Sequence, residues 1–84
     1  MMLYSNMRSI DLHGADRDYA KILVKDFIRD SVTMKEEYVL IIHGIGKGIV
    51  KKAVYEELKR NPFVKEYKQD NFNPGCTIVR ITID

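Results

Sequence analysis

The sequence of 84 residues is long enough for one domain with a single modest core, and its 45% hydrophobic and 31% charged residues are ordinary for a globular protein. A net charge of +2 excludes a histone-like basic surface, so contact with nucleic acid would depend on locally clustered cations. The single cysteine excludes an internal disulfide and a cysteine-based zinc site, and the apolar runs are too short to span a membrane. With no signal-peptide pattern, these features predict a cytoplasmic protein that does not contact a membrane.

Polar and apolar residues alternate over residues 8–13, and this period of two predicts a β-strand. Ile10 and Leu12 are expected on its buried face, whereas Asp11 and His13 share the opposite face. His13 is expected at the C-terminal end of the strand, directly before a glycine.

Apolar residues recur at helical spacing after Asp16, a residue suited to the N-cap, and predict a helix that runs to about Asp30. Residues 31–37 are expected to form a polar connection. Residues 38–42 are apolar without alternation, which is typical of a strand in the centre of a sheet.

A second amphipathic helix is predicted over residues 49–59, with an apolar stripe that begins at Ile49. Asn61-Pro62 ends this helix. Weak alternation with many charges over residues 64–69 predicts an edge strand, and residues 77–83 alternate again as a last strand.

The predicted order of elements is β-α-β-α-β-β. A strand, a crossover helix and a second strand form a right-handed parallel pair, and the last two strands form an antiparallel pair. The economical fold is a two-layer α/β (α+β) sandwich, in which a four-stranded mixed sheet carries two helices on one face. We expect this domain to occupy residues 9–84, after a lead-in of residues 1–8 that frays or packs through Leu3 and Tyr4.

The segment His43-Gly44-Ile45-Gly46-Lys47-Gly48 connects the second predicted strand to the second predicted helix. Three glycines at alternate positions predict a tight turn that leaves its backbone N–H groups bare. Bare amides at a helix N-terminus suit an anion, most often a phosphate. Lys47 adds a cation and His43 a group that titrates near neutrality, while Lys51 and Lys52 extend a basic rim.

Parallel neighbours would bring the C-terminal ends of the first two strands side by side, with His13 and His43 at those ends. Ligands of open α/β sheets gather at this end of the strands. Asp11 points to the same face and can hold a proton, orient a histidine or bind a cation. Simpler interpretations are a plain tight turn, polar surface histidines, solvated lysines, and a cross-strand pair of Asp11 with Arg80.

Ile10-Asp11-Leu12-His13-Gly14 resembles the LDLHG motif of the Smr (small MutS-related) domain family, and the glycine segment after residue 42 matches its HGxGxG motif. The resemblance extends from about Ser9 to Asp84. It implies a β-α-β-α-β-β fold similar to the C-terminal domain of translation initiation factor three. Several family members are nicking or RNA-cleaving endonucleases, so the resemblance implies binding of DNA or RNA and cleavage of a phosphodiester bond.

By position, the resemblance gives Asp11 and His13 the catalytic role and places the histidine and glycines of the second motif at the bound strand: His43, Gly44, Gly46 and Gly48. Our mechanistic hypothesis seats a phosphate on the loop amides near Lys47, with one histidine accepting a proton and the other donating one. Two histidines suffice for RNA, which has its own nucleophile. DNA nicking would need an activated water and a divalent cation such as Mg²⁺ or Mn²⁺. Because the candidate ligands are so few, no tight metal site is expected.

The family's glycine-rich GGxG stretch is replaced here by Asn73-Pro74-Gly75-Cys76, which puts substrate contact through that loop in doubt. The printed sequence also lacks the long basic extension that many members carry before the domain. We therefore expect weak substrate affinity, or affinity supplied by a larger protein partner or by a second copy in a homodimer. Phe72 has two interpretations, base stacking and packing of its own loop, of which packing is preferred.

The competing function is a non-catalytic module that grips a nucleic-acid backbone without cutting it, with affinity that falls steeply with salt. A third interpretation is a small-anion or nucleotide-binding domain. Against it, the glycine loop is not G-x-x-x-x-G-K-[ST], and no acidic residue plainly follows a dinucleotide fingerprint. The choice between DNA and RNA stays open at this point.

Overall fold

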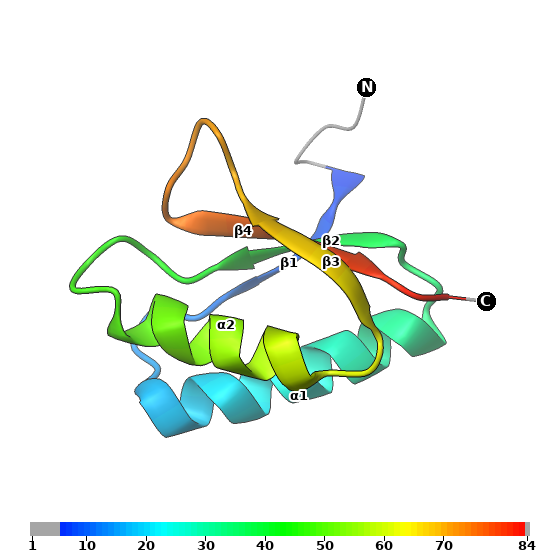
Figure 1. Cartoon of the computed structure of the whole chain (residues 1–84), viewed down its shortest axis with the longest axis horizontal. Coiled ribbons are helices and arrows are strands. Elements are labelled where there is room, and N and C mark those ends of the chain that lie inside the picture. The colour runs from blue at the N-terminus through cyan, green and yellow to red at the C-terminus, as the bar shows by residue number, and fades with distance from the viewer. Residues whose placement is uncertain (1–5, 84) are drawn as a thin grey trace.

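Two helices cover one face of a four-stranded sheet in the computed structural model, which describes residues 6–83 (Figure 1). The elements are β1 (Arg8–Asp11), α1 (Arg17–Thr33), β2 (Tyr38–Ile42), α2 (Ile49–Arg60), β3 (Val64–Gln69) and β4 (Cys76–Ile81). This confirms the predicted order and the two-layer architecture. The predicted packing of Leu3 and Tyr4 lies outside the described residues.

The sheet has the order β1-β2-β4-β3, with β1 and β2 parallel and β4 antiparallel to both of its neighbours. The apolar β2 is therefore central and the charged β3 is an edge strand, as predicted. Asp11 pairs with Ile42, Ile42 with Cys76, and Gln69 with Thr77. β1, β2 and β3 thus end where β4 begins, and we call this the carboxyl end of the sheet.

The core lies between the sheet and the helices because alternate strand residues and one stripe of each helix are apolar. Its fully buried aliphatic side chains come from both layers: Leu12, Val24, Ile28, Val39, Ile41, Val54, Leu58, Val79 and Ile81. α1 starts at the predicted cap, since Asp16 Oδ1 accepts a hydrogen bond from Tyr19 N at 2.8 Å. No helix within residues 6–83 has the length and apolar character needed to cross a membrane.

α1 continues one turn beyond the predicted end at Asp30, so the start of the predicted polar connection was wrong. Ser31 is fully buried in that last turn. Its hydroxyl donates to the Phe27 carbonyl at 2.7 Å and accepts from Arg8 Nε at 3.3 Å. These partners satisfy the hydroxyl inside the helix, which the polarity of serine in the sequence does not reveal.

The predicted stripe of α2 is wrong at Ile49, and the structure buries Glu57, to which no position was assigned from the sequence. Ile49 is 57% exposed, whereas Glu57 is 8% exposed and accepts a hydrogen bond from Asn61 Nδ2 at 3.3 Å. Val50 in the same turn packs against the core, whereas Ile49 lines the cavity at the carboxyl end of the sheet.

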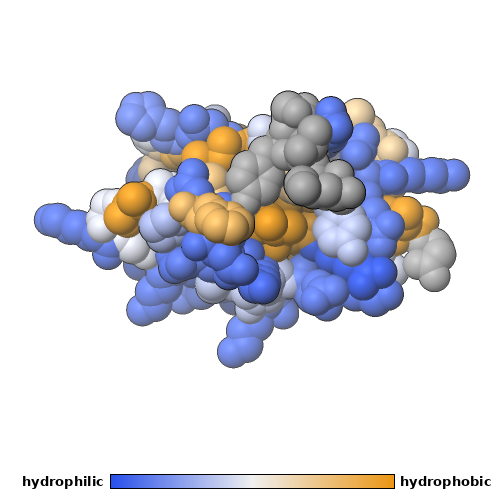
Figure 2. Space-filling view, turned by 90° about the horizontal axis from the view of Figure 1, so that it is seen from above, coloured by the Kyte–Doolittle hydropathy of each residue, from blue (hydrophilic) through white to orange (hydrophobic). Residues whose placement is uncertain are grey.

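The face of the sheet opposite the helices carries a small apolar cluster of Met7, Leu40 and Cys76, against which Ile42 and Ile78 pack. Figure 2 looks onto this face and shows apolar side chains gathered near its middle among charged ones. Arg80 donates to Glu37 at 3.0 Å and to Glu66 at 3.3 Å. The predicted alternative of an Asp11–Arg80 pair was wrong because β2 separates β1 from β4.

Candidate active site

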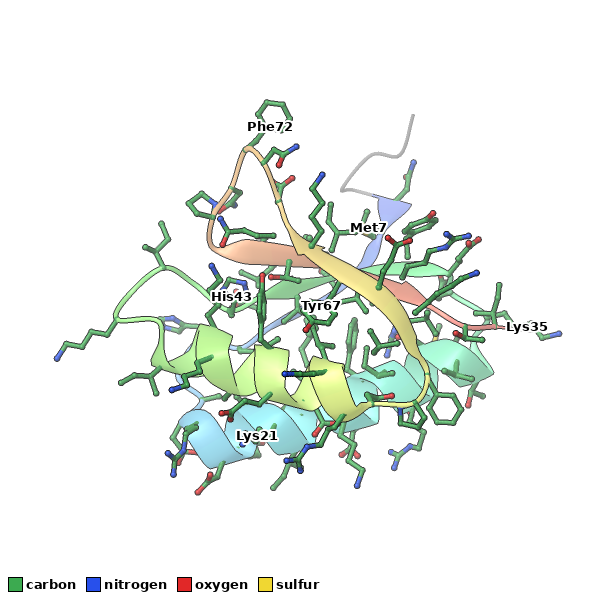
Figure 3. The ribbon with its side chains drawn as sticks, viewed as in Figure 1. Met7, Lys21, Lys35, His43, Tyr67 and Phe72 are labelled. Atoms are coloured by element: carbon green, nitrogen blue, oxygen red, sulfur yellow. The ribbon has the colours of Figure 1, made fainter. Side chains whose placement is uncertain are left out.

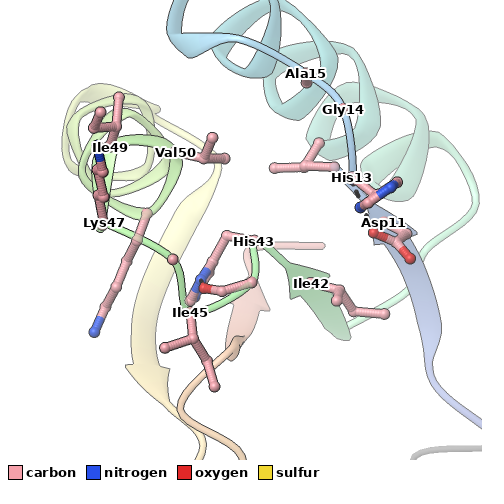
Figure 4. A pocket seen from close by; sticks show the side chains of 15 residues that line it. Asp11, His13, Gly14, Ala15, Ile42, His43, Ile45, Lys47, Ile49 and Val50 are labelled. Carbon is pink, nitrogen blue, oxygen red and sulfur yellow. Dashed lines mark hydrogen bonds between the residues drawn. The ribbon is translucent and has the colours of Figure 1, made fainter.

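A cavity of about 590 Å³ opens at the carboxyl end of the sheet (Figure 4). Its wall is formed by residues 11–15, which follow β1, and by residues 42–51, which run from the end of β2 through the glycine loop into α2. The parallel pairing of β1 and β2 brings these two segments together. Asp11, His13 and His43 therefore line one cavity, as the sequence predicted.

In the glycine loop, residues 43–48, the His43 and Gly44 N–H groups donate to the Gly75 carbonyl, so only the amides nearer α2 are bare as predicted. Gly44, Gly46 and Gly48 have φ angles of 82°, 35° and 79°. Gly48 is the N-cap of α2 in the left-handed conformation and provides no side-chain hydrogen bond to the helix. A β-carbon at Gly48 would meet no atom within 4 Å, so its glycine is needed for the backbone angle rather than for space. The N–H groups of the first helical turn are left for solvent or a ligand.

Asp11 positions His13 through the main chain. β1 ends at Asp11, and its Oδ1 accepts a hydrogen bond from the His13 backbone N–H at 2.9 Å. Both residues are exposed, so the His13 imidazole is accessible to a molecule bound in the cavity. Figure 4 shows the two side chains on one wall of the cavity, with His43 and Lys47 across from them.

His43 differs from His13 because its ring is buried and hydrogen-bonded inside the protein. His43 is 8% exposed, with its Nδ1 2.9 Å from the Gly44 carbonyl oxygen and its Nε2 2.8 Å from Thr77 Oγ1. Since a carbonyl oxygen can only accept, Nδ1 carries a proton. In the neutral ring Nε2 accepts from the Thr77 hydroxyl, whose oxygen lies 3.0 Å from the Tyr55 hydroxyl. A chain of hydrogen bonds thus runs from Tyr55 through Thr77 and His43 to Gly44.

Burial lowers the pKa of His43 below the ordinary value of 6.5; the hydrogen bond to the Gly44 carbonyl opposes this shift and the charge of Lys51 adds to it. The ring is therefore neutral at physiological pH and holds the start of the glycine loop. Acid–base catalysis by His43 stays a prediction, and it would require one of the two ring hydrogen bonds to break.

The stability of the protein is expected to fall as pH drops below about 6.5, because the unfolded chain then binds a proton at His43 that the folded chain resists. The stabilisation is complete above the unfolded pKa and is lost as pH falls through the lower folded pKa. Urea unfolding at several values between about pH 5 and pH 8 measures this dependence. His43→Gln should flatten the profile in that window. Equal slopes for wild type and His43→Gln would contradict the assignment.

Sequence reasoning missed the residues that hold the glycine loop from behind. The Gly75 carbonyl accepts hydrogen bonds from the N–H groups of His43 and Gly44, both at 3.0 Å. A β-carbon at Gly75 would lie 3.4 Å from the Gly44 Cα, so the two loops pack backbone to backbone. The stretch that departs from the family pattern therefore anchors the glycine loop. One feature of the sequence could have indicated Thr77: it is a polar residue at an inward-facing position of an otherwise apolar strand.

The predicted basic rim is divided in the structure. Lys47 is exposed and lines the cavity. Lys51 also lines it, but its Nζ donates to Gln69 Oε1 and lies 5.6 Å from the centre of the Tyr55 ring. Lys52 is exposed on α2 and is not among the residues that line the cavity. Lys47 is therefore the cation best placed to meet an anion on the loop amides.

Comparison with known proteins assigns the family. The model of the Smr domain matches residues 10–82. The chain belongs to the Smr domain family. The resemblance of the two motifs to this family is thereby confirmed.

Two solved structures share the Smr fold. The Smr domain of Thermus thermophilus MutS2 superposes with a TM-score of 0.86 at 22% identity, covering 89% of this chain and 98% of that one. YdaL, a stand-alone small MutS-related protein from Escherichia coli, superposes with a TM-score of 0.83 at 24% identity, covering 90% of this chain and 65% of that one.

Curated relatives include proteins named endonuclease MutS2. That of Clostridium novyi is 36% identical over 73 residues, which are 87% of this chain and 9% of the relative. That of Caldicellulosiruptor saccharolyticus is 36% identical over 76 residues, which are 87% of this chain and 10% of the relative. This Smr domain thus spans about a tenth of the length of these relatives.

Proposed function

We propose that this Smr domain binds nucleic acid at the carboxyl end of its sheet and cleaves the phosphodiester backbone there. The observation that carries the proposal is one cavity with bare loop amides on one wall and an exposed histidine beside a carboxylate on the other. The loop supplies unpaired amides and Lys47, and the facing wall supplies Asp11 and His13. The names of the curated relatives, endonuclease MutS2, support the same chemistry.

The binding half of the site is suited to a phosphate. Amides at the N-terminus of a helix carry partial positive charge and point toward the ligand. The hydrogen bonds that the Gly75 carbonyl accepts and the buried His43 ring hold the loop before any ligand arrives. A preformed loop loses less conformational freedom on binding, which favours affinity.

In the proposed reaction, His13 accepts the proton of the attacking oxygen. On RNA this is the 2′-hydroxyl, whose oxygen forms a new bond to phosphorus while the bond to the 5′-oxygen breaks, leaving a cyclic phosphate. The 5′-oxygen takes a proton from water or from an acid in the site. Asp11 fixes His13 through its backbone and adds a negative charge that stabilises the imidazolium.

No three His, Cys, Asp or Glu side chains within residues 6–83 lie close enough together to hold a metal ion. A divalent ion needed for DNA would have to take most of its ligands from the substrate and water.

Cleavage assays on single-stranded RNA, structured RNA and branched DNA, each with and without EDTA, test the proposal. The proposed use of the 2′-hydroxyl predicts that RNA is cut in EDTA. Cutting of DNA that EDTA abolishes would retain the nuclease function but replace the nucleophile by an activated water. A protein that binds all three substrates and cuts none would support the alternative function, a non-catalytic nucleic-acid-binding module.

That alternative, a non-catalytic nucleic-acid-binding module, is favoured by one observation. Of the two histidines, one imidazole is exposed and the other is committed to hydrogen bonds inside the protein. The same loop and Lys47 would then bind a nucleic-acid backbone, but the site would lack the second acid–base group needed to cleave it.

Both functions predict the same effect of Lys47→Ala on binding. Loss of one phosphate contact should weaken binding to all sequences alike and reduce the slope of log affinity against log salt by roughly 1. Fluorescence anisotropy with a labelled oligonucleotide at several salt concentrations measures the slope. Lys59→Ala removes a similar exposed charge from the far end of α2 and should leave the slope unchanged. An unchanged slope for Lys47→Ala would place the phosphate elsewhere.

A further inference from the structure

Phe72 is exposed to an unusual degree at the tip of the loop between β3 and β4. Its side chain is 92% exposed, so the sequence-based preference for packing inside its own loop was wrong. Figure 3 shows the ring pointing away from the fold, above the end of the sheet that carries His43. Single exposed apolar residues are common on protein surfaces, so exposure alone assigns no role.

The position of Phe72 in the fold adds a second observation. Three loops meet at the carboxyl end of the sheet: the turn after β1 with His13, the glycine loop after β2, and the loop of residues 70–75 before β4. Because β4 pairs with β2, the glycine loop lies between His13 and the loop of Phe72. β1 and β4 are two strand spacings apart, about 10 Å. A nucleic-acid strand that crosses the glycine loop therefore has His13 on one side and Phe72 on the other.

The loop of residues 70–75 is held in place rather than loosely attached. Asn73 Oδ1 accepts from Gly75 N at 3.0 Å, and its carbonyl accepts from Cys76 N at 3.0 Å. Gly75 in turn binds the backbone of the glycine loop, as described above. The aromatic ring is thus carried on a loop anchored directly to the proposed phosphate site.

The chemistry around Phe72 favours bases over phosphates. Residues 70–75 contain no lysine or arginine, so this loop offers no cation to a phosphate. Ile45, at the bend of the glycine loop, is 68% exposed. Phe72 and Ile45 are the two most exposed large hydrophobic side chains within residues 6–83, and both flank the proposed phosphate site.

We infer that Phe72 is a stacking platform for an unpaired base next to the phosphate bound by the glycine loop. This inference rests on the proposed nucleic-acid binding and specifies its substrate as a single-stranded region. The ring has an exposed π-face, which every base can stack on, so the preference is for unpaired bases rather than for a sequence. A base inside a duplex keeps its neighbours on both faces and cannot stack on Phe72 without being flipped out.

The first test measures affinity for a single-stranded oligonucleotide of about twelve nucleotides. Phe72→Ala should weaken binding roughly 5- to 100-fold, the effect of losing one base–aromatic stack. Phe63→Ala is the matched control, because Phe63 is also exposed, at 44%, but precedes β3 at the opposite end of the sheet. Its affinity should equal that of wild type. Equal affinity of Phe72→Ala and wild type would overturn the inference.

A second variant tests stacking itself. The chain contains no tryptophan, so Phe72→Trp introduces a single fluorescent reporter that still has an aromatic face. Its emission should be quenched by the single strand, and much less by an abasic strand of the same length or by a duplex. Quenching by the duplex equal to that by the single strand would overturn the inference.

The abasic strand separates the two proposals. If it binds with the Lys47-dependent salt slope and Phe72→Ala changes nothing for the intact strand, the base platform is disproved and the phosphate site stands. Failure of every strand to bind the wild-type protein would overturn both.

Discussion

His13→Ala is expected to reduce the rate of phosphodiester cleavage by roughly 10²- to 10⁴-fold, the usual contribution of a positioned acid–base group. The imidazole is exposed at the cavity and makes no contribution to the core, so the fold should survive its removal. The assay is single-turnover cleavage of whichever substrate the cleavage assays above show to be cut, with thermal unfolding measured in parallel. Affinity for the oligonucleotide should change little, since the loop amides and Lys47 supply the binding.

Asp11→Asn separates two roles of the neighbouring carboxylate. The amide oxygen of asparagine can still accept the hydrogen bond that Asp11 takes from His13 N at 2.9 Å, but the negative charge is lost. A large loss of rate would show that the charge matters, whereas a small one would show that positioning of His13 suffices. Asp30→Asn, an exposed substitution on α1, is the control. Activity that survives both His13→Ala and Asp11→Ala would rule out the proposed mechanism.

Thr77→Val is expected to lower the free energy of unfolding by about 1–3 kcal/mol, the cost of leaving a buried polar group without its partner. Thr77 is fully buried, and its hydroxyl serves both His43 Nε2 at 2.8 Å and the Tyr55 hydroxyl at 3.0 Å. Valine keeps the shape of threonine but supplies no hydrogen bond. The measurement is urea unfolding at about pH 7.5, where the His43 ring is neutral.

Thr77→Ser is the matched control because it retains the hydroxyl and loses a methyl group. Its pH profile of stability should keep the decline below about pH 6.5, since the hydrogen bond to His43 remains. Binding to the oligonucleotide should weaken in Thr77→Val, because the ring that anchors Gly44 is no longer held from behind. A Thr77→Val protein with wild-type stability would show that the hydrogen-bond chain contributes little.

The fold was largely predictable because its elements are long and regular in pattern. The uninterrupted apolar run of β2 indicated a central strand, and the charges on β3 indicated an edge, and both were correct. The end of α1 was missed because Ser31 is polar in the sequence but is satisfied by the Phe27 carbonyl and Arg8. Ile49 was placed in the core because helical spacing does not show that its side chain lines the cavity.

The candidate site was predictable in its location and not in its detail. Two strands that pair in parallel must end together, so the motifs that follow them were expected to meet, and the structure brings them into one cavity. From the sequence, His13 and His43 were both expected to act as acid–base groups, without a distinction between them. They differ because a histidine's role depends on which groups surround its ring, and those groups come from other parts of the chain.

The order of strands and helices, the parallel pairing and the placement of both motifs follow from the sequence by itself, because periodicity, glycines and caps act over a few neighbouring residues. Only the tertiary structure decided that His43 is buried, since Thr77 lies 34 residues further along the chain and Tyr55 reaches it from α2. It also decided that Phe72 is exposed, because packing of a loop residue depends on which surfaces the folded chain brings within reach.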